Sequence, residues 1–456
     1  MAIKPSTPKG TRDFSATEIA KRNYIRTIIQ NNFEYFGFQP IETPSFERLE
    51  TLTGVYGEEG DRLVFKILNS GEKVKKADIE ALSSGQYQKF SRSLSEKALR
   101  YDLTVPFARY VAQHQNELTF PFRRYQIQPV WRADRPQHGR FQEFYQCDAD
   151  IVGDRSLWQE IEVLDLYDRV FSDLKIKNVK LKINHRKLLA GIAGKFGVKE
   201  RLADFTIALD KLDKIGKEGV FDELISKGFK SDSLLLLEEL LSLNGKPLQQ
   251  LKVLKSILAD QPEGIEGIEE LEFIFKQFNQ STLNSVQLDF DLTLARGLHY
   301  YTGMIVEVSP PDSTKVGSIG GGGRYDDLTS TFGLNNMSGI GISFGFERIF
   351  LVMESLNLFP DELLPVTQVL FINFGSDAAA LAYSCLSKLR QHNIISELYP
   401  TEAKLKKQLG YANQKGILKV VLIGEEEVRK NSFILKDMNK GTQKSYSIKD
   451  LISVIS

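Results

Sequence analysis

FRRYQIQPVWRADRPQHGRFQEFYQCDADI, residues 122–151, is the stretch of this chain that decides its fold class. Polar and apolar residues alternate on both sides of RPQHG, which predicts a long antiparallel hairpin. Because side chains alternate across a strand, the even positions of the second strand share one face. These positions hold Gln142, Phe144, Gln146, Asp148 and Asp150. Arg132, across the hairpin, can supply a guanidinium that binds a carboxylate or phosphate through two hydrogen bonds. Such a face suits a zwitterionic small molecule joined to a phosphate.

The composition is typical of a soluble globular protein. A length of 456 residues suggests about three domains. The 59 basic and 59 acidic residues give no net charge, which excludes a generally basic nucleic-acid coat and leaves local basic faces open.

Cysteine and histidine usage restricts the chemistry. With only Cys147 and Cys385 present, we expect no disulfide framework and a cytoplasmic location. The five histidines lack the spacing of metal ligands, so we expect no metal site built on His or Cys.

The start, MAIKPSTPKGTRDF, has no apolar signal core, and no apolar run approaches the length of a membrane span. We therefore expect no membrane partner.

The pattern along the chain predicts an α+β fold in several parts. An amphipathic helix over 17–36 is followed by an extended segment that contains Pro44. Residues 69–97 are polar and indicate an exposed insertion. The expected domains are a first core part (1–184), an all-helical insertion (185–285), a second core part (286–360) and a β-α-β-α-β unit with a parallel sheet (366–456).

The glycine motifs allow two interpretations. GIGISFG (339–345) does not fit the dinucleotide-binding fingerprint, and no phosphate-loop G-K-[ST] occurs. GGGGRYDDL (320–328) is either a flexible turn or a strand in which a side chain would block a ligand. The apolar and aromatic flanks favour the strand.

Arginines and carboxylates recur on four predicted strand segments. Arg123, Arg135 and Arg140 fit ordinary surface charges. LARGLHYYTG (294–303) carries Arg296 and two tyrosines, which a strand would point to opposite faces; simple aromatic packing explains that segment equally well when it is taken alone. LRYDLT (99–104) adds Asp102 and Thr104, and Arg348 follows GISFG at a strand-to-helix junction. Together the four segments favour one shared site.

These residues resemble those of a known family. The segments that carry the resemblance are KGTRDF, LRYDLTVPFARY, WRADRPQHGRFQEFYQCDADIVG, LARGLHYYTG, GGGGRYDDL and GISFGFERI. The chain resembles the histidyl-tRNA synthetases, which are class II aminoacyl-tRNA synthetases, and its segments are closer in sequence to the eukaryote-like subgroup. The resemblance covers the whole chain in order. It implies an antiparallel sheet flanked by helices, a helical insertion domain and a C-terminal α/β anticodon-binding domain.

The resemblance also implies roles for individual residues. The arginines that would contact ATP are Arg132 at the α-phosphate and the histidine carboxylate, Arg296 near the α-phosphate and Arg348 at the γ-phosphate. The α-amino group would meet Asp102, Thr104 and Gln146, and the imidazole would meet Asp150 and Tyr301. The remaining implied histidine-binding positions are Leu103, Tyr300, Gly320, Gly321 and Gly322, with Gly323 in the same strand.

The implied reaction needs no protein nucleophile. Histidine and ATP would give histidyl-adenylate and pyrophosphate, and the amino acid would pass to the 3′ end of tRNA(His). Mg²⁺ would be held mainly by the ATP phosphates, and the helix of 17–36 together with the strand that holds Pro44 would build a homodimer interface. The basic residues of TEAKLKKQLGYANQKG (401–416) either face the anticodon stem or form an ordinary solvated helix face.

Two other functions compete with this one. The first is a catalytically silent regulatory paralogue that binds histidine as an effector; it should lack the C-terminal domain and several phosphate arginines. The second is a synthetase for another amino acid on the same core. The regulatory function is disfavoured because the chain keeps the C-terminal domain (366–456) and the arginines Arg132, Arg296 and Arg348. Specificity for another amino acid is disfavoured by the segment LARGLHYYTG.

Overall fold

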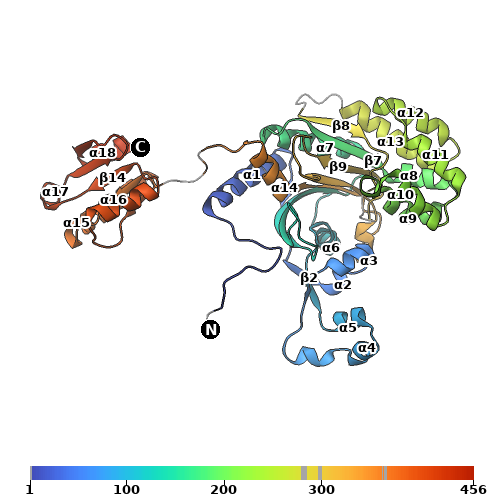
Figure 1. The fold of residues 1–456 in the computed structure, drawn as a ribbon, viewed down its shortest axis with the longest axis horizontal. Coiled ribbons are helices and arrows are strands. Elements are labelled where there is room, and N and C mark those ends of the chain that lie inside the picture. Colours follow the sequence, from blue (N-terminus) through green and yellow to red (C-terminus); the bar gives the residue numbers. More distant parts are fainter. Residues whose placement is uncertain (1–2, 279–284, 296–299, 362, 364–366, 456) are drawn as a thin grey trace. The chain divides into compact units, whose positions relative to one another are not determined.

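The structure is a computed structural model that describes residues 3–278, 285–295, 300–361, 363 and 367–455. The chain divides into two compact units, Met1–Phe359 and Pro360–Ser456, which are described separately (Figure 1). Within the described ranges, every helix falls short of the length or the apolar character that a bilayer crossing needs.

An eight-stranded sheet forms the centre of the first unit. In spatial order its strands are β1 (Gln39–Pro40), β5 (Phe122–Trp131), β6 (Glu143–Val152), β11 (Gly339–Gly345), β10 (Gly320–Tyr325), β9 (Met304–Ser309), β7 (Val179–His185) and β8 (Val286–Phe290). All neighbours are antiparallel except β1 with β5 and β7 with β8. The predicted antiparallel sheet is therefore confirmed, with a short parallel pair at each edge.

The predicted hairpin is the strand pair β5–β6, but its register does not place Arg132 opposite the acidic residues of the second strand. Pairing runs from Phe122 opposite Val152 to Trp131 opposite Glu143. Arg132 therefore lies just beyond the strand end, where its backbone N–H donates to the Gln142 carbonyl at 2.9 Å. The residue opposite Asp150 is Arg124. Counting pleats from the turn could not show this, because the sequence does not fix how many residues the turn contains.

Helices that pack against this sheet include α1 (Ala16–Tyr35), α7 (Trp158–Asp173) and α14 (Phe346–Ser355) (Figure 1). Helix α1 begins at a capping box in which Ser15 and Glu18 satisfy each other's backbone N–H groups. Its Phe33 is fully buried, with its ring 5.4 Å from that of Tyr125 and 5.8 Å from that of Phe344. Burying an aromatic ring of this size contributes about 1.5–3 kcal/mol, so α1 is tied directly to β5 and β11.

The predicted helical segment lies between β7 and β8. It consists of α8 (Arg186–Lys195), η2 (Lys199–Arg201), α9 (Leu202–Leu209), α10 (Leu212–Ser226), α11 (Ser231–Leu241), α12 (Pro247–Ile257) and α13 (Pro262–Phe278). Its apolar side chains, such as Leu188 and Leu271, belong to the same buried cluster as the sheet residues. The helices therefore extend the core of the first unit.

Smaller elements pack against the sheet along β5. They are α2 (Leu49–Leu52), α3 (Gly57–Leu63), α6 (Thr104–His114), and a three-stranded sheet in the order β2 (Phe46–Arg48), β4 (Lys97–Leu99), β3 (Lys66–Ile67). The polar segment 69–97 adds η1 (Gly71–Lys76), α4 (Ile79–Ser83) and α5 (Tyr87–Ser93). A second buried cluster, which includes Phe107 of α6 and Phe122 of β5, joins this layer to the main sheet.

The second unit contains the predicted β-α-β-α-β pattern. Strands β13 (Ser396–Leu398), β12 (Val369–Phe371) and β14 (Lys419–Leu422) are parallel, and α15 (Ser376–Gln391) and α16 (Leu405–Gln414) connect them. Beyond the prediction, β15 (Phe433–Asp437) and β16 (Gln443–Tyr446) extend the sheet antiparallel. Helices α17 (Glu425–Lys430) and α18 (Ile448–Ile455) complete the unit.

Gly322→Ala should destabilise the first unit. A Cβ at this position would collide with the backbone carbonyl oxygen of Gly341 on the neighbouring strand, and overpacking of this kind typically costs about 1–3 kcal/mol. Scanning calorimetry of the full chain should show a lower melting temperature.

The matched control is Gly410→Ala in α16, where a Cβ would meet nothing within 4 Å. Alanine there should be neutral or stabilise the helix by up to about 1 kcal/mol. Equal melting behaviour of the two variants would contradict the close strand packing at Gly322.

Candidate active site

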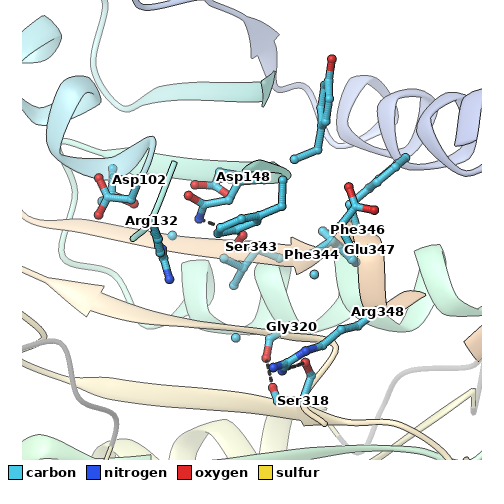
Figure 2. A pocket seen from close by; sticks show the side chains of 18 of the residues that line it. Asp102, Arg132, Asp148, Ser318, Gly320, Ser343, Phe344, Phe346, Glu347 and Arg348 are labelled. Atoms are coloured by element: carbon cyan, nitrogen blue, oxygen red, sulfur yellow. Dashed lines mark hydrogen bonds between the residues drawn. The ribbon is translucent and has the colours of Figure 1, made fainter. Parts of the chain in front are cut away.

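A pocket in the first unit collects side chains from β6, β10, β11, α14 and the segments around Asp102 and Arg132 (Figure 2). Most of the predicted site residues line it: Asp102, Thr104, Arg132, Gln146, Asp150, Tyr300, Tyr301, Gly320, Gly321 and Arg348. Arg296 lies outside the described residues. Segments that are far apart in the sequence therefore meet at one surface.

Three of the predicted residues stand outside the pocket lining. Leu103 is fully buried as the N-cap of α6, and its carbonyl accepts a 3.5 Å hydrogen bond from Arg124. Gly322 faces the backbone of β11, so the missing side chain serves strand packing at that position. Gly323 also lies outside the lining. Of the two interpretations of the glycine run, the strand is correct, and only Gly320 and Gly321 border the pocket.

The paired tyrosines do not lie on a strand. Tyr300 is in a turn and Tyr301 has no regular structure, since β9 begins only at Met304. The two rings pack 4.7 Å apart, and both line the pocket. The expected opposite orientation was wrong because strand alternation does not apply outside a strand.

The guanidinium groups of Arg132 and Arg348 approach the pocket from different sides (Figure 2). Arg132 donates from Nε to the Tyr101 carbonyl at 3.0 Å and lies over the Tyr101 ring at 4.3 Å. Arg348 donates to the Ser318 carbonyl at 2.7 Å. Burial lowers the pKa of Arg348, and the nearby positive charge of Arg140 lowers it further. Each guanidinium is thus anchored to backbone while it lines the pocket.

Asp150 is held by two residues that the sequence analysis did not assign. Arg124 Nη2 lies 2.7 Å from Asp150 Oδ2, and the Tyr325 hydroxyl donates to Asp150 Oδ1 at 2.6 Å. Burial raises the pKa of Asp150, while Arg124 and Tyr325 favour its ionised form. The hairpin register would have revealed Arg124, but no local signal marked Tyr325.

Asp102 and Asp148 are further buried carboxyl groups in the lining, each only 2 % exposed. Asp102 Oδ1 accepts from the Tyr56 hydroxyl at 2.9 Å and from the Val105 N–H at 3.1 Å. Burial raises the pKa of Asp102. Burial also raises the pKa of Asp148 to about 7, with Arg124 opposing the rise and Asp150 adding to it. Strand parity placed Asp148 on the correct face, although no role was assigned to it.

The N-terminal segment and α1 contact Glu347, which lines the pocket. Glu347, beside Arg348, accepts hydrogen bonds of 2.6 and 2.8 Å from Arg22 of α1 and one of 3.0 Å from Arg12. The Arg12 guanidinium also lies 4.4 Å from the centre of the Phe141 ring. The KGTRDF segment therefore contacts both the residues after the hairpin turn and the start of α14.

Comparisons with known proteins agree with this architecture. Residues 80–349 match the family described as "Histidyl-tRNA synthetase", and residues 368–456 match "Anticodon binding domain". The chain is 58% identical over 451 residues to a histidine–tRNA ligase of Christiangramia forsetii and 53% identical over 469 residues to one of Flavobacterium johnsoniae, with 99% of each chain covered. The crystal structure of a histidyl-tRNA synthetase from Nostoc sp. PCC 7120 is similar at a TM-score of 0.78 and 29% identity, covering 100% of this chain and 99% of that one.

Asp148→Asn should raise the free energy of unfolding, and more at pH 8 than at pH 5. The carboxyl has a pKa of about 7 in the folded protein and ~3.9 in an unfolded chain, so its ionisation opposes folding. This cost grows as the pH rises from about 4 to about 7 and is complete above that range. We expect a gain at pH 8 of more than about 1.4 kcal/mol, the value of one pKa unit. Urea unfolding at both pH values measures it.

Asp168→Asn is the matched control. Asp168 is equally buried, but its carboxylate accepts from the backbone N–H groups of Ser285 and Val286 at 2.8 and 3.1 Å. Removing that charge should lower stability at both pH values. A loss of stability in Asp148→Asn at pH 8 would contradict the assignment of its raised pKa.

Proposed function

The chain belongs to the histidyl-tRNA synthetase family, and from this premise we propose that the pocket of its first unit joins histidine to tRNA(His). The activity is that of a histidine–tRNA ligase. The assignment of the active site to this pocket rests on one observation. Residues from three separated parts of the chain line it together: Asp102 before α6, Arg132 and Asp150 in the β5–β6 hairpin, and Arg348 in α14.

The arginines provide the electrostatic part of the first step. The histidine carboxylate attacks the α-phosphorus of ATP, pyrophosphate leaves, and histidyl-adenylate remains. Arg132 contacts the α-phosphate and the carboxylate, Arg348 contacts the γ-phosphate, and Arg296 acts near the α-phosphate. Fixed guanidinium groups stabilise the charge that develops on phosphate oxygens. The backbone anchors of Arg132 and Arg348 support this role, because they limit the reorganisation needed on binding.

Asp150 and Tyr301 recognise the imidazole of histidine. Arg124 and Tyr325 orient the Asp150 carboxylate, and each carboxylate oxygen can accept more than one hydrogen bond. A side chain without an N–H at this position would leave the remaining acceptor capacity of this buried carboxylate unused, which favours histidine over such a side chain. Gly320 and Gly321 leave room for the substrate, and Tyr300 packs against Tyr301. We propose no substrate contact for Leu103 or Gly322.

The α-amino group of histidine lies against Asp102, Thr104 and Gln146. In the second step the terminal ribose hydroxyl of tRNA(His) attacks the acyl carbon of the adenylate. No protein nucleophile takes part in either step.

Mg²⁺ enters with ATP. Within the described residues, no three His, Cys, Asp or Glu side chains gather as a metal site, so phosphate oxygens are the ligands that fit. When bound, the ion neutralises phosphate charge. The protein's own contribution is the position of its arginines.

The second unit binds the anticodon region of tRNA(His), and the basic face of α16 with Lys406 and Lys407 contacts the anticodon stem. The protein acts as a homodimer through α1 and the extended segment that holds Pro44. Support comes from β1, which precedes Pro44 and is an exposed two-residue strand at the sheet edge. Its location is cytoplasmic, where its free cysteines remain reduced.

Histidine alone among the twenty amino acids should support ATP–pyrophosphate exchange by the purified chain, because only its imidazole pairs with Asp150 and Tyr301. Charging of purified tRNA(His) should follow. Exchange with no amino acid would indicate a histidine-binding regulator, and exchange with a different one would indicate another synthetase.

Arg348→Ala should slow ATP–pyrophosphate exchange by roughly 10- to 150-fold, because one charge-assisted interaction contributes about 1.5–3 kcal/mol. Arg169→Ala is the control, since Arg169 is exposed on α7 and its ion pair among the described residues is the local one with Asp173 at 3.2 Å. An exchange rate equal to that of the control would remove Arg348 from the phosphate site.

A further inference from the structure

Three buried acceptor atoms in the pocket lack a hydrogen-bond partner among the described residues: Asp102 Oδ2, Gln146 Oε1 and Asp148 Oδ1. All three residues line the same pocket. A buried acceptor without a partner costs about 1–3 kcal/mol, so three at one surface indicate a place built to receive donors.

Other contacts orient two of these side chains. Asp102 uses Oδ1 for Tyr56 and for the Val105 N–H, and its Oδ2 is the unpartnered atom. Gln146 donates from Nε2 to the Ser343 hydroxyl at 3.4 Å, so its carbonyl oxygen points away from that contact. In each case one end is anchored and the other is left for a ligand.

The backbone orients Asp148. It lies within β6, paired with Gln126 of β5 on one side and with Ser343 of β11 on the other. Its position two residues after Gln146 puts both side chains on one face of the strand. Figure 2 shows Asp148 in the pocket together with Ser343, Asp102 and Arg132, all of which line it.

The local charge favours a cationic ligand. Asp102, Asp148 and Asp150 are all buried, and the buried cation among them, Arg124, is paired with Asp150. Burying a carboxylate is costly unless it is paired. When they are ionised, Asp102 and Asp148 give the pocket an excess of negative charge that Arg124 does not pair. A single ammonium group would offset this charge while it donates three hydrogen bonds, and its presence would favour the ionised form of Asp148, whose pKa is about 7 without a ligand.

We propose that Asp148 is a direct ligand of the α-ammonium group of histidine and completes a three-acceptor clamp with Asp102 and Gln146. This inference rests on the proposed function of the pocket and deepens it. Asp148 then determines specificity for an α-amino acid over the corresponding acid without the amino group. Asp150, two residues further along, remains the imidazole ligand, so one strand recognises both nitrogen-bearing ends of the substrate.

The test compares two ligands that differ only in the ammonium group. Calorimetric titration of the full chain with L-histidine and with 3-(imidazol-4-yl)propionate gives affinities for the unaltered protein and for Asp148→Asn. The substitution should weaken histidine binding by about 10- to 150-fold, the range for one charge-assisted hydrogen bond. The affinity for the propionate should stay the same or increase, because the neutral amide introduced by the substitution does not repel the carboxylate of this ligand.

Asp168→Asn serves as the control for loss of a buried carboxylate outside the pocket, and it should change neither affinity. A melting curve of each variant establishes that it is folded. Equal weakening of both ligands by Asp148→Asn would assign Asp148 a structural role and overturn the proposal, as would unchanged histidine affinity. If the unaltered chain bound neither ligand, the proposed function itself would fail.

Discussion

The ion pair between Arg124 and Asp150 is the interaction on which the pocket depends. It crosses between adjacent strands of the central hairpin, with both side chains almost fully buried. Moving such charges out of water costs several kcal/mol per ion, and a buried pair is weak evidence for stability. What it provides is orientation: the guanidinium and the Tyr325 hydroxyl hold one carboxylate in place. The stacking of Arg124 over Phe107, at 4.2 Å, ties this pair to α6.

The neighbouring strand must leave room for that carboxylate. A Cβ at Gly341 would collide with Asp150 Oδ1, and Gly341 pairs directly with Asp150 in the β6–β11 ladder. The glycine therefore allows the carboxylate to lie over the backbone of β11. Backbone spacing and charge placement are thus parts of the same arrangement, because the ion pair forms only if the side chain can occupy that space.

The arginines of the hairpin region divide into different environments. Arg123 pairs with Glu162, Arg124 pairs with Asp150, and Arg140 lies 3.3 Å from Asp134. Arg140 also lines the pocket, although its sequence context indicated an ordinary surface charge. The local concentration of positive charge therefore serves both to neutralise buried or bordering carboxylates and to present guanidinium groups to a ligand. Only the partners that surround each arginine separate these uses.

The sequence by itself determined the antiparallel hairpin, the helical segment after His185, the β-α-β-α-β unit and ten of the residues that border the pocket. Periodicity and motif spacing carry that information, because each depends on residues close together in the chain. The tertiary structure decided that Arg124 opposes Asp150, that Tyr325 joins them, and that both Tyr300 and Tyr301 line the pocket. It also decided that Leu103 and Gly322 serve packing. These outcomes depend on strand register and on contacts between residues up to 175 positions apart, and the energies of such contacts exist only once the strands are paired and water is excluded.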